Sequence, residues 1–395
     1  MKIISINAGS SSLKFKLFDM TTESVISSGL FERIGIDGSF YTIKFNNESI
    51  KEEIDLPDHT EAIRILIDKL ISLDIIKSLE EIKGIGHRVV SGGEKYKDSV
   101  LITDQVIEDI ESMRDFAPIH NPQAAKVIRS FKEVLPTTPM VAIFDTTFHQ
   151  SMEKENYLYP VPYSWYEKHG VRKYGAHGTS YRYVAEELEK QLGKKEIKSI
   201  ICHIGSGASI SAVKDGKCVD TSMGFTPVTG IMMATRSGDM DPSIITFIME
   251  KEGKNALEVL NDLNNNSGLL GVSGVSPDTR DIEKGISEGN ERCKLALDMY
   301  IKRIVDYIAK YYVLLDGIDA IAFTAGVGEN GTNIRKAVID KLSCLGIKID
   351  VESNKNVNGE IRKISSDDSS ALVYVIPTNE ELVMARDTLR LATNR

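Results

Sequence analysis

Residues 3–15 read Ile-Ile-Ser-Ile-Asn-Ala-Gly-Ser-Ser-Ser-Leu-Lys-Phe, a short apolar strand followed by a turn of small residues and a second strand. Such a turn can offer backbone N–H groups and serine hydroxyls to a phosphate group, with Lys14 beside them. The same order recurs in residues 200–213, where an apolar strand passes through the turn 205–208 into another strand. The repeat predicts a duplicated fold with phosphate-binding turns, although either turn alone is equally typical of an ordinary hairpin.

The composition is that of an ordinary globular protein, with 42% hydrophobic and 27% charged residues, and a length of 395 residues predicts two domains. A net charge of −9 argues against a nucleic-acid or membrane-surface binder. Four widely spaced cysteines without a CxxC pair argue against a zinc site or a disulfide framework and predict a cytoplasmic location. We expect neither a signal peptide nor a membrane span, because no apolar run approaches roughly 18 residues.

Predicted strands and helices alternate along the chain, which is typical of an α/β protein. The apolar runs 82–90, 140–144, 318–325 and 372–376 predict strands. Apolar residues at helical spacing predict helices that begin near 58 and 290. Cap residues predict helices that begin near 104, 121 and 180, and a last helix is expected from 379. The expected N-caps include Thr103 or Asp104, Asn121 and Ser180.

Two glycine patterns bear on nucleotide binding. No GxxxxGK[ST] sequence occurs, so ATP binding would require a scaffold other than the P-loop. Gly326, Gly328 and Gly331 form a GxGxxG sequence after a predicted strand, with Asp350 about 20 residues further on, which imitates a dinucleotide fingerprint. A single match close to the C-terminus is a weak signal, and it leaves a dinucleotide-binding oxidoreductase as an alternative function.

Several charged and polar side chains are placed where they could meet an anion or a metal. The basic candidates at strand ends or in loops rich in Gly, Ser and Pro are Lys14, Arg88, Arg236 and Arg280. The histidine candidates in similar loops are His120, His177 and His203, although a loop histidine can equally hydrogen-bond a carbonyl group. Asn7, Asp145 and Glu380 could hold Mg²⁺, which prefers a few hard oxygen ligands, although Asp145 is equally consistent with a helix cap.

Ordered motifs along essentially the whole chain resemble the acetate kinase family, which belongs to the wider group of sugar kinases, Hsp70 and actin. The motifs are Asn7–Lys14, His87–Val90, Pro118–Pro122, Phe144–Thr146, Tyr174–Ser180, His203–Ser209, Met223–Pro227, Thr235–Pro242, Thr324–Asn330 and Pro377–Glu381. Such a series is far more specific than a single glycine motif.

The resemblance implies a duplicated ribonuclease-H-like α/β fold with a central cleft. Its N-terminal domain would span residues 1–150 and be joined by the C-terminal helix 379–395, and the C-terminal domain would span 151–378. It also implies reversible transfer of the γ-phosphoryl group of ATP to acetate or another short-chain carboxylate, with Mg²⁺ or Mn²⁺. The resemblance also implies a homodimer that forms through the C-terminal half.

Residue roles also follow from the resemblance. Catalysis is expected from Asp145, His177 and Arg236, with Asp145 holding Mg²⁺ or its waters, and the metal ligands are expected to be Asn7 and Glu380. The acid is expected to bind at Arg88, Val90, Ile119, His120, Ala176 and Pro227. The nucleotide is expected to bind at Lys14, Ser10, Ser12, His203, Ile204, Gly205, Ser206, Gly207, Asp278, Thr279, Arg280, Thr324, Ala325, Gly326, Val327 and Gly328. No general base is required, because a carboxylic acid with a pKa below about 5 is already ionised at neutral pH.

The chain departs from the family pattern at a few of these positions. Ala176 stands where Phe is usual, Tyr181 where His is usual, and Ser206 where Asn or Asp is usual. The other two departures are Ala234 for Gly and Ser91 for His. Loss of the ring at 176 should enlarge the acid pocket and favour propionate or butyrate, unless a neighbour such as Tyr181 fills the space. A nucleotide-binding protein that has lost catalysis is a further alternative.

Overall fold

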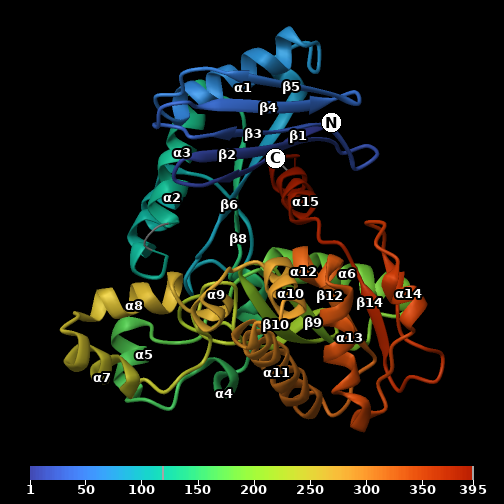
Figure 1. The fold of residues 1–395 in the computed structure, drawn as a ribbon. Coiled ribbons are helices and arrows are strands. Elements are labelled where there is room, and N and C mark those ends of the chain that lie inside the picture. The colour runs from blue at the N-terminus through green and yellow to red at the C-terminus, as the bar shows by residue number, and fades with distance from the viewer. Residues whose placement is uncertain (118–119, 394–395) are drawn as a thin grey trace. The chain divides into compact units, whose positions relative to one another are not determined.

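The computed structural model describes residues 1–117 and 120–393, and the chain divides into two compact units (Figure 1). Unit 1 comprises Met1–Thr147 together with Asn379–Arg395, and unit 2 comprises Phe148–Thr378. Each unit has its own β-sheet and its own hydrophobic cores.

Unit 1 contains an eight-stranded sheet in the order β5-β4-β3-β2-β1-β6-β8-β7. The strands are β1 (Lys2–Ala8), β2 (Ser12–Asp19), β3 (Ser24–Glu32), β4 (Phe40–Phe45), β5 (Glu48–Glu53), β6 (Ile82–Val89), β7 (Val100–Leu101) and β8 (Met140–Phe144). The helices are α1 (His59–Ser72), α2 (Asp104–Ser112), α3 (Asn121–Val134) and α15 (Glu380–Thr393), with 3₁₀ turns at Leu79–Glu81 and Met113–Asp115.

Helices cover both faces of β6, as the alternation of its side chains requires. On one face His87 packs edge-on against Phe131 of α3, with ring centroids 5.0 Å apart. On the other face Gly86 lies so close to α15 that a Cβ atom there would approach the Thr388 hydroxyl to 2.4 Å. The glycine therefore lets the C-terminal helix pack directly on the central strand.

Unit 2 contains a six-stranded sheet in the order β11-β10-β9-β12-β14-β13. Its strands are β9 (Lys198–Ile204), β10 (Ala208–Lys214), β11 (Lys217–Thr221), β12 (Ala320–Thr324), β13 (Arg362–Lys363) and β14 (Leu372–Val375). The helices are α4 (Lys154–Tyr157), α5 (Tyr163–His169), α6 (Gly178–Leu192), α7 (Ser243–Glu252), α8 (Ala256–Asn265), α9 (Gly268–Ser273), α10 (Thr279–Ser287), α11 (Glu291–Leu314), α12 (Ala325–Asn330), α13 (Thr332–Asp340) and α14 (Val351–Lys355). Two 3₁₀ turns span Thr147–Ser151 and Ser343–Leu345. One core lies between the sheet and α11, and a second packs α6 on the opposite face.

The two sheets repeat one five-strand arrangement, and the predicted duplication is confirmed. In unit 1 the order β3-β2-β1 is antiparallel and continues through the parallel strands β6 and β8. In unit 2 the order β11-β10-β9 is antiparallel and continues through the parallel strands β12 and β14. The turns at 9–11 and 205–207 occupy equivalent places, between the first two strands of each copy.

Some local expectations were wrong. Ser180 lies inside α6, and the N-cap position belongs to His177, whose φ is 58°. Asn121 is the first residue of α3 rather than its cap. In the GxGxxG segment, Gly326 and Gly328 lie within the helix α12, and Gly331 is its C-cap. In the described parts of the chain, no helix has both the length and the apolar character needed to cross a bilayer.

Candidate functional site

Three predicted site residues of unit 1 meet at one edge of its sheet. Asn7, Arg88 and Asp145 lie at or next to the carboxyl ends of β1, β6 and β8, which run parallel. Arg88 donates through Nη2 to Asp145 Oδ2 at 2.6 Å and through Nε to the same oxygen at 3.0 Å. Its Nη1 lies 3.5 Å from Asn7 Oδ1. The structure thus brings these three side chains together, and their roles stay predictions.

Glu380 and Glu381 open α15 beside this cluster. Burial raises the pKa of Glu380 to about 7, with the charges of Asp145 and Glu381 adding to the effect and those of Arg88 and Lys14 opposing it. Burial acts in the same direction on Glu381, but Lys16 and Lys14 outweigh it and hold that pKa at about 2. Lys14 Nζ lies 2.7 Å from Glu381 Oε1, so the predicted phosphate ligand is also the partner of a carboxylate.

The side-chain oxygen atoms of Asn7, Asp145 and Glu380 are of the type that a magnesium ion binds. Asp145 and Glu380 are close enough for one charge to raise the other's pKa, and a divalent cation would relieve that repulsion. The amide oxygen of Asn7 is a third hard ligand. Over residues 1–117 and 120–393 no group of three or more His, Cys, Asp or Glu is arranged to hold a metal. Two carboxylates and one amide oxygen are a donor set of the kind that Mg²⁺ uses, because Mg²⁺ takes few protein carboxylates and completes its shell with water and phosphate.

The small-residue turn of unit 1 uses one of its backbone N–H groups for a hydrogen bond within the turn. Gly9 N donates to Ser12 O at 2.9 Å, and His59 Nε2 lies 3.1 Å from Gly9 O. A Cβ atom at Gly9 would approach the Ser12 hydroxyl to 2.8 Å, so the tight turn depends on glycine. The Gly9 N–H is therefore not available to a phosphate, and Ser10 and Ser12 stay as predicted ligands.

The predicted acid-binding residues are distributed over both units. In unit 1, Val90 is half-buried after β6 and His120 is exposed before α3, while Ile119 lies outside the described residues. In unit 2, Ala176 is buried, and Pro227 is half-buried and accepts a 3.4 Å hydrogen bond from Arg236 through its carbonyl oxygen.

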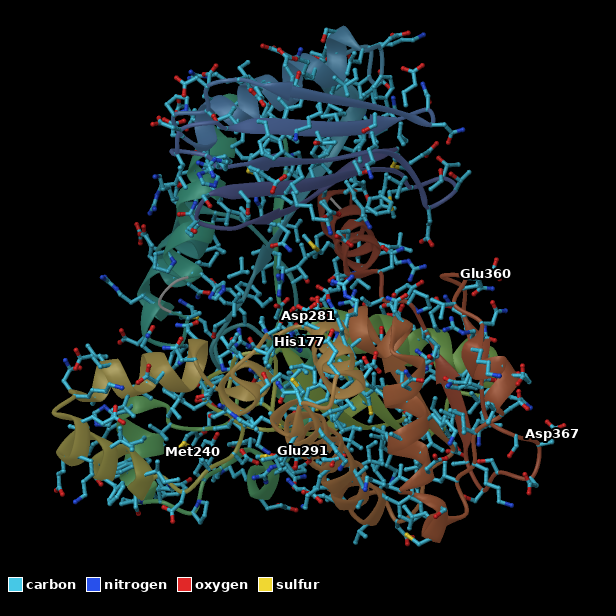
Figure 2. All side chains as sticks on the ribbon, viewed as in Figure 1. His177, Met240, Asp281, Glu291, Glu360 and Asp367 are labelled. Carbon is cyan, nitrogen blue, oxygen red and sulfur yellow. The ribbon has the colours of Figure 1, made fainter. Side chains whose placement is uncertain are left out.

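His177 is held between the start of α6 and the β9–β10 hairpin (labelled in Figure 2). Its left-handed backbone is strained for a non-glycine residue and is typical of a functional position. Nδ1 lies 2.8 Å from Ser209 Oγ, and the ring stacks on His203 with centroids 4.0 Å apart. His203 Nδ1 in turn lies 2.9 Å from Ser180 Oγ.

Arg236 and His177 face the same small residue. A Cβ atom at Gly207 would lie 3.2 Å from Arg236 Nη1 and 3.7 Å from His177 Nε2. Burial lowers the pKa of Arg236, and its hydrogen-bond partners among the described residues are the Pro227 carbonyl and the Met233 sulfur rather than a carboxylate. A half-buried guanidinium that faces a glycine turn without a counter-ion suits the stabilisation of a bound or developing anion.

A cavity of about 530 Å³ opens beside this turn in unit 2, a volume in the range of ligand pockets. The predicted nucleotide residues that line it are Gly205, Ser206, Asp278, Thr279, Arg280, Gly326 and Val327. The predicted residues His203, Ile204, Gly207, Thr324, Ala325 and Gly328 do not line it. Asn330 and Gly331, which belong to the glycine-rich segment noted in the sequence, also line it. Lining residues for which the sequence predicted no nucleotide role are Ala234, Leu269, Pro277, Glu283, Tyr300, Thr332, Asn333 and Ile334.

The helix α12 forms one wall of the cavity and is fixed from both ends. At its start Glu329 Oε1 accepts hydrogen bonds from Ala325 N at 2.9 Å and from Thr378 N at 3.1 Å. At its end the fully buried Arg335 donates to Gly328 O and Glu329 O at 2.8 and 2.9 Å. These bonds satisfy helix-end groups that would otherwise be unpaired.

The chain was compared with known proteins. Residues 2–386 match the acetokinase family. The acetate kinase of Bacillus subtilis (strain 168) is 54% identical over 393 residues, which cover 99% of each chain. The crystal structure of Porphyromonas gingivalis acetate kinase superposes with a TM-score of 0.94 at 44% identity, and that of a propionate kinase from Francisella tularensis subsp. tularensis SCHU S4 with 0.93 at 40%, each over 99% of both chains.

These matches agree with the two repeated sheets and give the chain the duplicated α/β fold of the actin, Hsp70 and sugar kinase group. The GxGxxG segment is therefore not a dinucleotide-binding loop, and the oxidoreductase alternative is wrong. The chain belongs to the acetokinase family.

Proposed function

We propose that the protein is an acetate kinase that transfers the γ-phosphoryl group of ATP to acetate, giving acetyl phosphate and ADP in a reversible reaction. The observation that carries the proposal is membership of the acetokinase family over residues 2–386, together with identities above 50% to acetate kinases over the full chain.

The main physical difficulty of this reaction is that an anionic acid must approach a polyanion. In our proposal Arg88 binds the carboxylate of the acid, and Arg236 with His177 stabilises charge on the transferring phosphoryl group. The 530 Å³ cavity of unit 2, bordered by Asp278, Arg280 and Gly326, takes the nucleotide. Acetate is ionised at neutral pH and attacks without a general base.

Asn7 and Glu380, supported by Asp145, would hold Mg²⁺ or Mn²⁺ through hard oxygen atoms. When bound, the ion supplies charge neutralisation to the phosphate groups. The protein side chains keep the two carboxylates close together and place Arg88 between Asp145 and Asn7. We further propose a cytoplasmic homodimer that forms through unit 2.

Propionate is a second candidate substrate. The small side chain of Ala176 favours it, and one of the similar solved structures is described as a propionate kinase.

The test is detection of acyl phosphate as the hydroxamate after incubation with ATP, Mg²⁺ and acetate. We expect product formation that ceases when EDTA removes the metal. Nucleotide binding without any acyl phosphate from acetate, propionate or butyrate would contradict the proposal and favour a protein that has lost catalysis.

A further inference from the structure

Two buried hydroxyl groups form a series of hydrogen bonds that ends at His177. Tyr181 Oη is hydrogen-bonded to Ser209 Oγ, and Ser209 Oγ lies 2.8 Å from His177 Nδ1. Tyr181 and Ser209 are each 0% exposed. The tyrosine ring is held by Phe148 and by His149, with centroids 6.1 and 5.6 Å away. Nothing in the motif pattern of the sequence indicates this chain of contacts.

The donors and acceptors in this series of contacts decide which nitrogen of His177 carries a hydrogen atom. Burial raises the pKa of the Tyr181 phenol well above its usual range, so the hydroxyl keeps its hydrogen. A neutral imidazole has one donor nitrogen and one acceptor nitrogen, and a hydrogen bond at Nδ1 decides which is which. If Tyr181 donates to Ser209, then Ser209 donates its own hydrogen to Nδ1, and the hydrogen of the imidazole is on Nε2.

The buried phenol fixes the direction of this chain. Among the described residues the hydrogen-bond partner of Tyr181 Oη is Ser209 Oγ, whereas the Thr221 hydroxyl donates to Ile210 O at 3.4 Å. If Ser209 donated to the phenol, the phenol hydrogen would be buried without an acceptor. Tyr181 therefore donates to Ser209, and Ser209 donates to His177.

This order matters because of where Nε2 lies. Nε2 of His177 and Nη1 of Arg236 border the same point above Gly207. Phosphoryl oxygens only accept hydrogen bonds, so a histidine at this place is useful only with a hydrogen on Nε2.

We propose that Tyr181 and Ser209 are positioning residues that hold His177 as the Nε2–H tautomer, with this N–H facing the phosphoryl group. The catalytic part of the inference rests on the proposed kinase function, whereas the tautomer does not. Tyr181 acts through Ser209 and does not touch the substrate.

The test uses the full chain with ¹⁵N-labelled histidine. Nitrogen chemical shifts distinguish the two tautomers, and the signal of His177 among the seven histidines is assigned by its loss in His177→Gln. We expect a protonated Nε2 and a bare Nδ1 in the wild type, and a mixture of tautomers in Tyr181→Phe and in Ser209→Ala. A wild-type spectrum with the hydrogen on Nδ1 would overturn the proposal, whether or not the protein is a kinase.

Kinetics supply the second readout. Tyr181→Phe keeps the ring and should lower kcat about tenfold, with KM for acetate and for ATP within about twofold. Tyr311→Phe is the matched control, because Tyr311 is also fully buried in unit 2 and its hydroxyl has no partner among the described residues. The control should retain wild-type kcat.

The double variant Tyr181→Phe/Ser209→Ala tests whether the two residues act through the same imidazole. Both residues act through one imidazole, so the double variant should be no slower than the slower single variant. Fully multiplicative losses, or equal kcat in Tyr181→Phe and Tyr311→Phe, would contradict a shared action on His177.

Discussion

Arg88 and Asp145 form an ion pair, with Nη2 2.6 Å from Oδ2, next to the carboxyl ends of the parallel strands β6 and β8. Asp145 is 1% exposed and Arg88 is 26% exposed. Removal of one partner from such a pair leaves a buried charge without compensation.

We therefore predict that Arg88→Ala lowers the free energy of unfolding by about 3 kcal/mol, in addition to weakening acetate binding. The double variant Arg88→Ala/Asp145→Asn should recover most of this loss, because it also removes the buried charge. Urea unfolding measures the free energy of unfolding of the single and the double variant. A loss below about 1 kcal/mol in the single variant would mean that water reaches Asp145 and screens it.

A second prediction concerns pH and the neighbouring His87. This ring is 2% exposed, its Nε2 has no partner among the described residues, and burial lowers its pKa to about 3. The neutral form is favoured in the folded state, so the stability is fully present above the unfolded pKa of about 6.5 and is lost as the pH falls towards 3, by about 1.4 kcal/mol per pH unit.

His87→Leu should remove this contribution. Between pH 6 and pH 4 its free energy of unfolding should fall less steeply than that of the wild type, by about one bound proton. The exposed His169 on α5 provides the control variant His169→Leu, which should keep the wild-type slope. Identical slopes in His87→Leu and the wild type would show that another group governs acid unfolding.

The features that the sequence predicted correctly are mostly local. Apolar strands on either side of a small-residue turn are enough to predict the two hairpins. The five-residue apolar run 140–144 is enough to predict β8. Thr103 caps α2 because its hydroxyl reaches the N–H three residues later, which is a property of the segment itself.

The errors arise where contacts with residues that are distant in the sequence determine the local structure. Ser180 resembles an N-cap, but its hydroxyl bonds to Thr378 and His203, and the helix begins earlier, at Gly178. The GxGxxG segment becomes a helix because Glu329 and Arg335 satisfy its ends. Leu269 and Asn333 line the cavity only because packing brings their helices together, and neither carries a motif.

The third prediction concerns the proposed dimer. Helix α7 has no buried residue although its sequence is largely apolar, and Phe247 is 55% exposed. On the neighbouring α8, Leu257 is 77% exposed. A soluble monomer rarely leaves such a patch uncovered, so we expect a second copy of the chain to cover it.

Phe247→Glu should therefore shift the protein from dimer to monomer in analytical ultracentrifugation. Val25→Glu introduces the same charge at an exposed apolar position of unit 1 and should leave the dimer intact. Equal masses for wild type and Phe247→Glu would place the dimer contact elsewhere or show that the chain is monomeric.

The fourth prediction separates binding from catalysis at Arg236. Among the described residues the guanidinium of Arg236 bonds to the Pro227 carbonyl and the Met233 sulfur and not to a carboxylate. If it acts on charge that develops in the transition state, Arg236→Ala should lower kcat by about 100-fold or more while KM for ATP changes little. Arg236→Lys keeps the charge without the planar donor pair and should recover part of the loss. A large rise in KM with unchanged kcat would assign Arg236 to ground-state binding.

The last prediction concerns the choice of acid at Ala176. Ala176 joins the core that contains Ile204 and Met223, whereas Tyr181 joins the separate cluster around α6 and is engaged with Ser209. This arrangement favours the interpretation that the space left by the missing ring is not refilled by Tyr181. Each additional buried CH₂ is worth about 0.8 kcal/mol, or roughly fourfold in kcat/KM.

We therefore expect the wild type to use propionate with a kcat/KM within about fourfold of that for acetate. Ala176→Phe should lower the ratio of kcat/KM for propionate to that for acetate by at least about tenfold, since an overfilled pocket excludes the longer acid more strongly than the shorter one. Ala234→Gly, a change in the lining of the nucleotide cavity, serves as the control and should leave the ratio of acids unchanged. A wild-type preference for acetate that Ala176→Phe does not alter would mean that position 176 does not form the wall of the acid pocket.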